Sequence, residues 1–221
     1  MTRRRTIRQL YRLGGPTGLA LHTFDWAMNR WSSWSIHRCL NLNEARVQLQ
    51  PKLQFRKLTA EEAGVLLAPL NDGIDAAFVE HASRKQDSCY AVFDGETVAH
   101  FTWFSTQSTL VDLDWRLEIP DGIVYKYNAF TFPEFRGRRL DSFVSTRALT
   151  DFRRRGYHSL ICLVSRTNFP ALRSNTRLGS QPLGTIASWK RGRMSCAYVT
   201  RSLRDNGIRL SAVVEPPLGL D

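Results

Sequence analysis

The sequence has few residues in the patterns that form disulfide bonds or bind a metal ion. It contains four cysteines in 221 residues, and no two of them have the C-x-x-C spacing of a metal pair. Cys89 and Cys162 lie in apolar runs, which is typical of small buried side chains in a reducing compartment. The five histidines also lack ligand spacing. We therefore expect neither a disulfide framework nor a bound metal.

Acidic residues and lysine are also scarce. The chain has 20 Asp and Glu against 31 Lys and Arg, and 26 of these 31 are arginine, which gives a net charge of +11. A GC-rich coding sequence explains this arginine bias as well as a functional need for positive charge does. In either case the positive electrostatic field of the protein favours anionic partners. These partners include phosphate-bearing ligands, an acidic carrier protein, RNA or an anionic membrane face.

Long apolar runs are missing too. Asp25 and Arg30 interrupt the longest apolar region, which excludes a membrane-spanning helix there. The run that follows the arginines at 3–5 is too short for a secretory signal, and no small-residue cleavage site follows it. We therefore expect a cytoplasmic protein.

The first 50 residues form a basic, Trp-rich extension with two interpretations. Residues 1–14 carry five arginines and no acid, 14–16 break the chain, and 17–40 have apolar residues at helical spacing. Arginines beside tryptophans suit an amphipathic anchor, with peripheral membrane contact through residues 1–40. Alternatively, the helix packs on its own domain or on a second subunit, as in a homodimer. The second interpretation is favoured because uncovered tryptophan is costly.

The remaining chain alternates strand and helix patterns. Thr59 and Glu62 form a capping-box pattern, and Asp94-Gly95 marks a hairpin between two strands. The predicted strands are 53–58, 88–93, 97–104, 125–132, 159–164 and 184–190, and a turn at 190–193 joins the last of them to a pairing segment at 194–203. Residues 111–117 form either a further strand or a loop. The predicted helices are 59–82, 140–155 and one after 168, and a short strand follows Gly207.

The most informative segment is the turn between the strand at 125–132 and the helix at 140–155. It reads Pro-Glu-Phe-Arg-Gly-Arg-Arg over residues 133–139. Backbone N–H groups at a helix N-terminus, together with the helix dipole, favour a bound anion. Arg136, Arg138 and Arg139 add fixed positive charge that suits phosphate oxygens.

These residues resemble the GNAT superfamily of N-acyltransferases, whose turn reads roughly P-x-x-R-G-x-G-[IL]-G and is followed by N-x-x-A and L-G-[FY]. The first motif is matched by Pro133, Arg136, Gly137 and Leu140, and the second by Asn168, Ala171, Leu178 and Gly179. The two partial motifs lie about 30 residues apart in a strand–helix–strand–helix context, which makes them stronger together than alone. The resemblance covers roughly residues 53–202.

The chain departs from this family at four positions. Arg139 and Asp141 replace the second and third glycines, Asn175 stands where the family has a tyrosine, and Ser180 replaces an aromatic residue. We expect Arg139 to present its N–H without a positive φ. Asp141 beside a phosphate is unfavourable unless its side chain caps the helix or points away.

The resemblance implies a fold, a co-substrate and a binding site. The implied fold is α/β (α+β), with a mixed, mostly antiparallel central sheet of six to seven strands flanked by helices. The implied co-substrate is acetyl-CoA or another acyl-CoA. Its phosphates would be held by Arg136, Gly137, Arg138, Arg139, Leu140 and Asp141. Its pantetheine arm and thioester carbonyl would be held by Ala129, Phe130, Thr131 and Asn168, although Asn168 also reads as a simple helix N-cap.

The catalytic groups are the weakest part of the resemblance. Family members often place an acid or histidine on the central strand, where this chain has Ile123, Tyr125 and Tyr127. A tyrosine with an ordinary pKa near 10 is a poor base, so Tyr125 and Tyr127 are candidates for orienting water, lining the acceptor pocket or donating a proton. Ser174 is a candidate for hydrogen bonding the leaving thiolate, and His100 is a possible relay. Proximity and an already neutral amine are an alternative to a base.

The resulting prediction is an acyltransferase domain at 51–205, an extension at 1–50 and a tail at 206–221. The predicted enzyme transfers an acetyl or longer acyl group from acyl-CoA to a primary amine of a small molecule or peptide, in a bacterial cytoplasm. The alternatives are an acidic acyl-carrier protein as donor, for an acylated amino acid or lipid product, an RNA- or tRNA-directed protein, and a non-catalytic binding module. Nucleic acid is less favoured because the arginines are scattered and no RNA motif is present.

Overall fold

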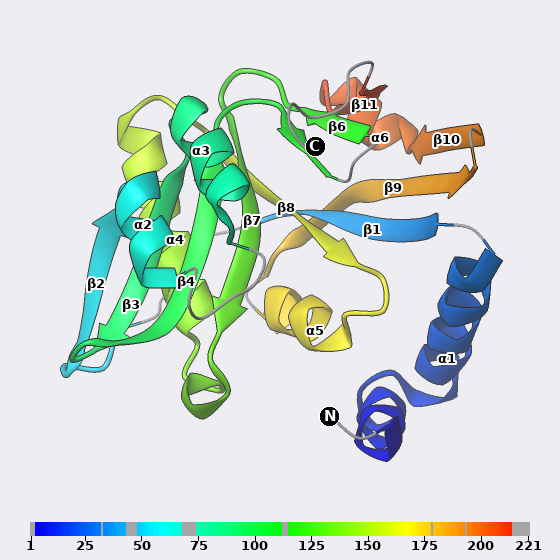
Figure 1. Ribbon diagram of the computed structural model, residues 1–221, viewed down its shortest axis with the longest axis horizontal. Helices are drawn as coiled ribbons and strands as arrows, with labels where there is room; N and C mark the ends of the chain where they lie inside the picture. The colour runs from blue at the N-terminus through cyan, green and yellow to red at the C-terminus, as the bar shows by residue number, and fades with distance from the viewer. Residues whose placement is uncertain are drawn as a thin grey trace. The chain divides into compact units, whose positions relative to one another are not determined.

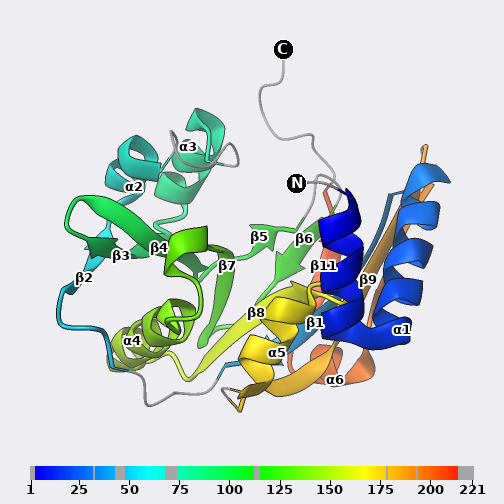
Figure 2. The ribbon, with the colours of Figure 1, turned by 90° about the horizontal axis from the view of Figure 1, so that it is seen from below.

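The computed structural model describes residues 3–31, 33–42, 48–67, 74–111, 115–177, 179–192 and 194–213. The contacts divide the chain into two compact units, and the division falls within strand β8 (Ser159–Ser165). Unit 1 comprises residues 1–41, 110–118 and 163–221, and unit 2 comprises 42–109 and 119–162. Figures 1 and 2 show the ribbon from two directions, and each unit is described by itself.

The sheet of unit 2 has the strand order β8-β7-β4-β3-β2. Strands β2 (Leu53–Leu58), β3 (Ser88–Asp94), β4 (Thr97–Ser105) and β7 (Ile123–Thr131) pair antiparallel with their neighbours, whereas β7 and β8 are parallel. Helices α2 (Ala60–Leu67) and α3 (Ala76–Arg84) cover one face, and α4 (Leu140–Arg154) covers the other (Figure 2). A short 3-10 helix, η2 (Pro133–Phe135), links β7 to α4.

The core of unit 2 explains why β3 and β4 are apolar along most of their length. Both strands are buried on both faces, because the helices lie on either side of them. Trp103 packs edge to face on Phe78 of α3, and Phe104 packs edge to face on Tyr90. The capping box at the start of α2 is confirmed, since the Thr59 and Glu62 side chains each accept a hydrogen bond from the other residue's N–H.

Unit 1 is built around the antiparallel strands β1 (Ser33–Asn41), β9 (Gln181–Arg191) and β10 (Met194–Val199). Helix α1 (Arg3–Trp31) is kinked at Gly15, which has non-helical dihedral angles and precedes Pro16. It contacts β1 and helix α5 (Phe169–Arg177), and helix α6 (Arg201–Asp205) packs on β9. A smaller sheet has the order β11-β6-β5, formed by β5 (Thr109–Leu110), β6 (Trp115–Glu118) and β11 (Arg209–Ala212).

The structure confirms the fold class and corrects three local predictions. Residues 33–40 belong to strand β1 and not to a helix, so the larger sheet has eight strands among the described residues, where six or seven were predicted. The helix at 59–82 is two helices, with non-helical residues at Ile74 and Asp75, and residues 201–205 are helical. Of residues 111–117, for which strand and loop were both left open, Trp115 to Leu117 belong to strand β6, and 112–114 lie outside the described residues.

Some sequence predictions fall outside the described part of the chain. They concern Leu178 of the second motif, Arg193 of the last turn and residues 112–114. The side chains of residues 3–14 and of Trp31 and Trp34 are also outside it, so the predicted membrane contact stays a prediction. The predicted domain boundaries likewise stay predictions. None of the described helices combines the length and apolar character of a membrane span.

Candidate acyl-donor site

The turn between β7 and α4 has the geometry of an anion-binding loop. After η2 the chain is extended at Arg136, takes a positive φ of 83° at Gly137, and enters α4 through Arg139. Within the described part of the chain, the backbone N–H groups of residues 137–142 have no acceptor in the protein. These groups lie at the start of a 15-residue helix, where the helix dipole adds partial positive charge.

The arginines of the turn are available to an anion. Arg136 and Arg139 are exposed and Arg138 is half-buried, and no carboxylate of the described residues pairs with any of them. The Arg136 Nε donates to the Thr131 carbonyl oxygen at 3.1 Å, and Arg138 lies 5.1 Å from the centre of the Phe135 ring. These contacts orient two guanidinium groups without neutralising them, so the turn keeps its positive charge.

Arg139 does not behave as the sequence predicted. It lies in the left-handed region, at φ 59° and ψ 27°, and its side chain makes no capping hydrogen bond. A side chain with a Cβ is strained in this conformation, whereas glycine is not. The position therefore requires the conformation that suits the glycine of the motif, although the residue is arginine.

Replacing Arg139 with glycine is expected to raise the free energy of unfolding by about 0.5 to 1 kcal/mol, because relief of strain exceeds the added entropy of the unfolded chain. Urea denaturation of the two proteins measures this difference. Arg138→Gly is the matched control, since φ at Arg138 is not positive, and it should lower stability. Equal effects of the two substitutions would contradict this reading of the turn.

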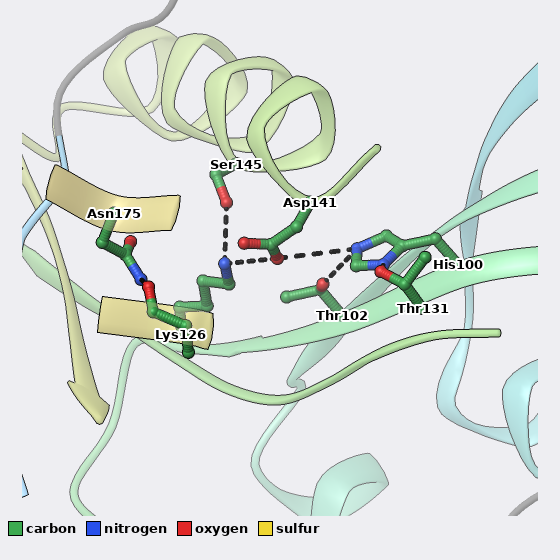
Figure 3. A network of polar contacts seen from close by, with 8 residues as sticks. His100, Thr102, Lys126, Thr131, Asp141, Ser145 and Asn175 are labelled. Carbon is green, nitrogen blue, oxygen red and sulfur yellow. Dashed lines mark hydrogen bonds and ion pairs between the residues drawn. The ribbon is translucent and has the colours of Figure 1, made fainter. Parts of the chain in front are cut away.

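Asp141, which replaces the third glycine, has its carboxylate directed toward Lys126 and His100 (Figure 3). Its Oδ1 accepts a hydrogen bond of 2.5 Å from Nζ of Lys126, a β7 residue that also donates to Ser145 Oγ at 3.0 Å. Burial is the largest single influence and raises the pKa of the Asp141 carboxyl. The Lys126 ammonium, His100 and the hydrogen bond from Lys126 together outweigh it, so the pKa falls below its ordinary range. The carboxylate is therefore neutralised inside the protein, and its charge does not oppose a phosphate.

Sequence reasoning missed Lys126, although a signal was present. Lys126 lies between Tyr125 and Tyr127 in an otherwise apolar strand, so alternation along the strand places it on the opposite face, toward α4. It is only 6% exposed. A lysine at such a position requires a buried partner, and Asp141 in the first turn of α4 is that partner.

His100 completes the polar cluster but is not suited to act as a base. It is fully buried, with Nδ1 2.8 Å from Thr131 Oγ1 and Nε2 2.7 Å from Thr102 Oγ1 (Figure 3). Burial lowers the pKa of His100 to about 4, and the Lys126 charge acts in the same direction while Asp141 opposes it. The imidazole is therefore neutral near pH 7, and its hydrogen bonds hold Thr131 at the end of β7.

The backbone assigned to the thioester carbonyl lies at a bulge in β7. Phe101 of β4 pairs with Phe130 of β7, and Trp103 pairs with Tyr127. Two β7 residues, Asn128 and Ala129, therefore lie opposite the single β4 residue between Phe101 and Trp103. Asn128 has a positive φ of 42°. A bulge bends a strand and releases backbone groups from the ladder, as a ligand-binding strand requires. Ala129 to Thr131 and the turn thus lie on consecutive segments of unit 2.

The rings of the two candidate tyrosines stack on each other with their centres 5.8 Å apart, and Tyr127 also contacts Phe78 of α3. The Tyr127 hydroxyl donates to Asp87 Oδ2 at 2.6 Å. Burial and the neighbouring Asp87 carboxylate raise the pKa of Tyr127, so it stays a phenol and not a phenolate. Asp87, which the sequence did not single out, borders a pocket of about 340 Å³ beside the first turn of α2.

The remaining predicted residues, Asn168 and Ser174, belong to unit 1. The Asn168 Oδ1 accepts from the Ala171 N–H at 3.2 Å, which makes Asn168 the N-cap of α5. Ser174 is half-buried on α5. Asn175, at the family's tyrosine position, is buried and donates to the Ala171 carbonyl at 2.8 Å, so it serves its own helix.

No protein-family model matches the chain, and neither does any curated protein. Solved structures do resemble it. A conserved protein of unknown function from Staphylococcus epidermidis is 9% identical at a TM-score of 0.52, over 76% of this chain and 66% of its own. A protein described as a GNAT-family acetyltransferase, from Novosphingobium aromaticivorans, is 13% identical at 0.51, over 70% and 62%.

A tandem GNAT protein from the clavulanic acid biosynthesis pathway is 11% identical at a TM-score of 0.50, over 87% of this chain and 58% of its own. The matched part thus spans about three fifths of the length of these proteins. At such identities the likeness concerns the fold alone. Together with the bulged strand and the basic turn at the start of α4, it shows that the chain has the GNAT fold.

Proposed function

We propose that the protein is an N-acyltransferase that uses acyl-CoA to acylate a primary amine. The observation that carries this proposal is the turn. It has free N–H groups at residues 137–142, three arginines that no carboxylate of the described residues pairs with, and an aspartate whose charge Lys126 cancels. This combination suits a pyrophosphate, which needs several donors and tolerates no nearby free carboxylate. The GNAT fold supports the same reaction class.

In this proposal Arg136, Arg138 and the N–H groups of the turn hold the phosphates of the donor. The bulged segment from Ala129 to Thr131 provides backbone groups for the pantetheine arm and for polarising the carbonyl. Bound acyl-CoA would supply the activated thioester carbon.

Neither Tyr127 of β7 nor His100 of β4 is suited to act as a general base, because Tyr127 is a phenol bound to Asp87 and the imidazole of His100 is buried with a lowered pKa. The acceptor amine therefore reacts in its neutral form, and the protein contributes mainly position and carbonyl polarisation. Tyr125 and Tyr127 line the face that an acceptor approaches. Ser174 remains a proposed partner of the leaving thiolate.

Thermal denaturation tests the donor site. Acetyl-CoA, a long-chain acyl-CoA or CoA, present well above its Kd, is expected to raise the melting temperature, because a ligand of the native state alone stabilises it. The rise should vanish in Arg136→Ala/Arg138→Ala, and the acyl-CoA that gives the larger rise indicates the acyl length. Arg153→Ala/Arg154→Ala, at the opposite end of α4, is the charge-matched control and should keep the rise.

Two outcomes would contradict the proposal. A rise that persists in the turn variant would mean that CoA binds elsewhere. No rise with any CoA would overturn acyl-CoA as the donor, and an acyl-carrier protein would then be tested before RNA. Transfer to an amine is measured by release of free thiol from whichever donor binds.

A further inference from the structure

A second cavity lies wholly within unit 1, and none of its lining residues has a role in the acyl-transfer proposal. It has a volume of about 640 Å³, which is in the range of cavities that hold small organic ligands. Helix α1 contributes Leu21, β1 contributes Arg38 and β9 contributes Thr185. The rest of the lining comes from α5 and from Arg166, which precedes it.

One face of α5 supplies most of the lining. Its lining residues follow helical spacing, i, i+3, i+4, i+7 and i+8. They are Phe169, Leu172, Arg173, Thr176 and Arg177. On this face Arg173 and Arg177 are exposed, whereas Phe169 and Leu172 are half-buried. The two arginines lie four residues apart and repel each other, which destabilises the helix slightly. The face of α5 that lines the cavity is therefore basic in one part and apolar in the other.

Three of the four arginines that line this cavity have no carboxylate partner among the described residues. Arg166 is paired with Asp25 of α1. By contrast, no carboxylate of the described residues pairs with Arg38, Arg173 or Arg177. The Thr176 hydroxyl is already used, because it donates to the Leu172 carbonyl at 3.0 Å. The groups left to bind a ligand are thus three guanidinium groups from two elements, beside the apolar side chains of Leu21, Phe169 and Leu172.

We propose that this cavity binds a small organic anion that has one terminal oxyanion and an apolar body. Guanidinium groups bind carboxylate and phosphate oxygens through paired N–H donors, and three of them around one space favour such a head group over a neutral one. The apolar side chains provide a surface for the body of the ligand, which inorganic phosphate lacks. The asymmetry of the lining, basic on one part and apolar on the other, is the feature that selects this class.

Titration calorimetry with four probes tests the proposal on the intact protein: octyl phosphate, octanoate, octanol and inorganic phosphate. Octyl phosphate or octanoate is expected to bind at least tenfold more tightly than octanol and than inorganic phosphate. The better of the two anions identifies the head group as phosphate or carboxylate. Octanol binding as tightly as both anions, or inorganic phosphate binding as tightly as octyl phosphate, would overturn the proposal, and neither result requires a variant.

Variants then locate the site. Arg173→Gln/Arg177→Gln keeps side-chain length and polarity but removes two charges, and it should weaken binding of the amphiphilic anion by about tenfold or more. Arg191→Gln/Arg209→Gln removes the same charge from exposed positions of unit 1 and should leave binding unchanged. An equal loss in both variants would mean that net charge alone attracts the anion. CoA binding at the turn should be unaffected by either variant, which separates this result from the test of acyl transfer.

Discussion

Replacing Lys126 with methionine is expected to lower the free energy of unfolding by about 3 kcal/mol. The lysine is 6% exposed, and its Nζ is the group that neutralises Asp141. Methionine fills a similar volume but leaves the Asp141 carboxylate with only the neutral His100 nearby, at 3.7 Å from Oδ1. The Asp141 side chain is 28% exposed, so water relieves part of the penalty and the expected loss is at the lower end for broken buried pairs.

A second substitution separates charge from packing. Adding Asp141→Asn to Lys126→Met removes the unpaired carboxylate, so the double variant should regain more than half of the free energy of unfolding that Lys126→Met loses. Lys52→Met is the control, because Lys52 and Asp94 form an exposed ion pair that should contribute less than about 1 kcal/mol. Denaturant unfolding measures all three. If the double variant were as unstable as Lys126→Met alone, the lysine would matter for packing and not for Asp141.

The stability of the protein is expected to fall as the pH decreases from about 6.5 to 4, because of His100. Its folded-state pKa is about 4, whereas an unfolded histidine titrates near 6.5, so between these values the unfolded chain binds the extra proton. The slope approaches about 1.4 kcal/mol per pH unit, which amounts to roughly 3 kcal/mol over the interval. The Asp141 pKa is lowered, so the stability that this group contributes is lost only at more acid pH.

His100→Gln should remove this slope between pH 6.5 and 4, whatever it does to stability at pH 7. His158→Gln, which changes an exposed ring, is the matched control and should retain it. Urea unfolding at several pH values supplies the comparison. A slope that is identical in wild type and His100→Gln would show that His100 is protonated in the folded protein or is accessible to water.

The sequence was sufficient to predict the elements whose signals are local. The hairpin at Asp94-Gly95, the strand that ends before Pro133 and the helix that follows Arg139 all appear as predicted. Each depends on residues that neighbour one another along the chain. The GNAT fold followed from the two linked motifs, because their residues mark the start of two helices in a fixed order.

Other features depended on partners that are distant along the chain. Strand β1 was mistaken for a helix, since its apolar residues fit helical spacing until pairing with β9, about 150 residues later, makes Ser33 to Asn41 extended. The role of Asp141 could not be read without Lys126, which is 15 residues earlier on another element. Arg139 is left-handed because of the path that the chain takes from β7 into α4, and the residue types of the turn do not determine that path.

Titration calorimetry of CoA against pantetheine tests the central claim most directly. Pantetheine has the thiol arm of CoA but none of its phosphates, so in the proposed site it would contact the bulged strand without engaging the turn. If the N–H groups of residues 137–142 and the arginines at 136 and 138 hold a pyrophosphate, CoA should bind at least about 100-fold more tightly than pantetheine. Equal affinities, or no binding of CoA at all, would contradict the account of this turn as a phosphate site.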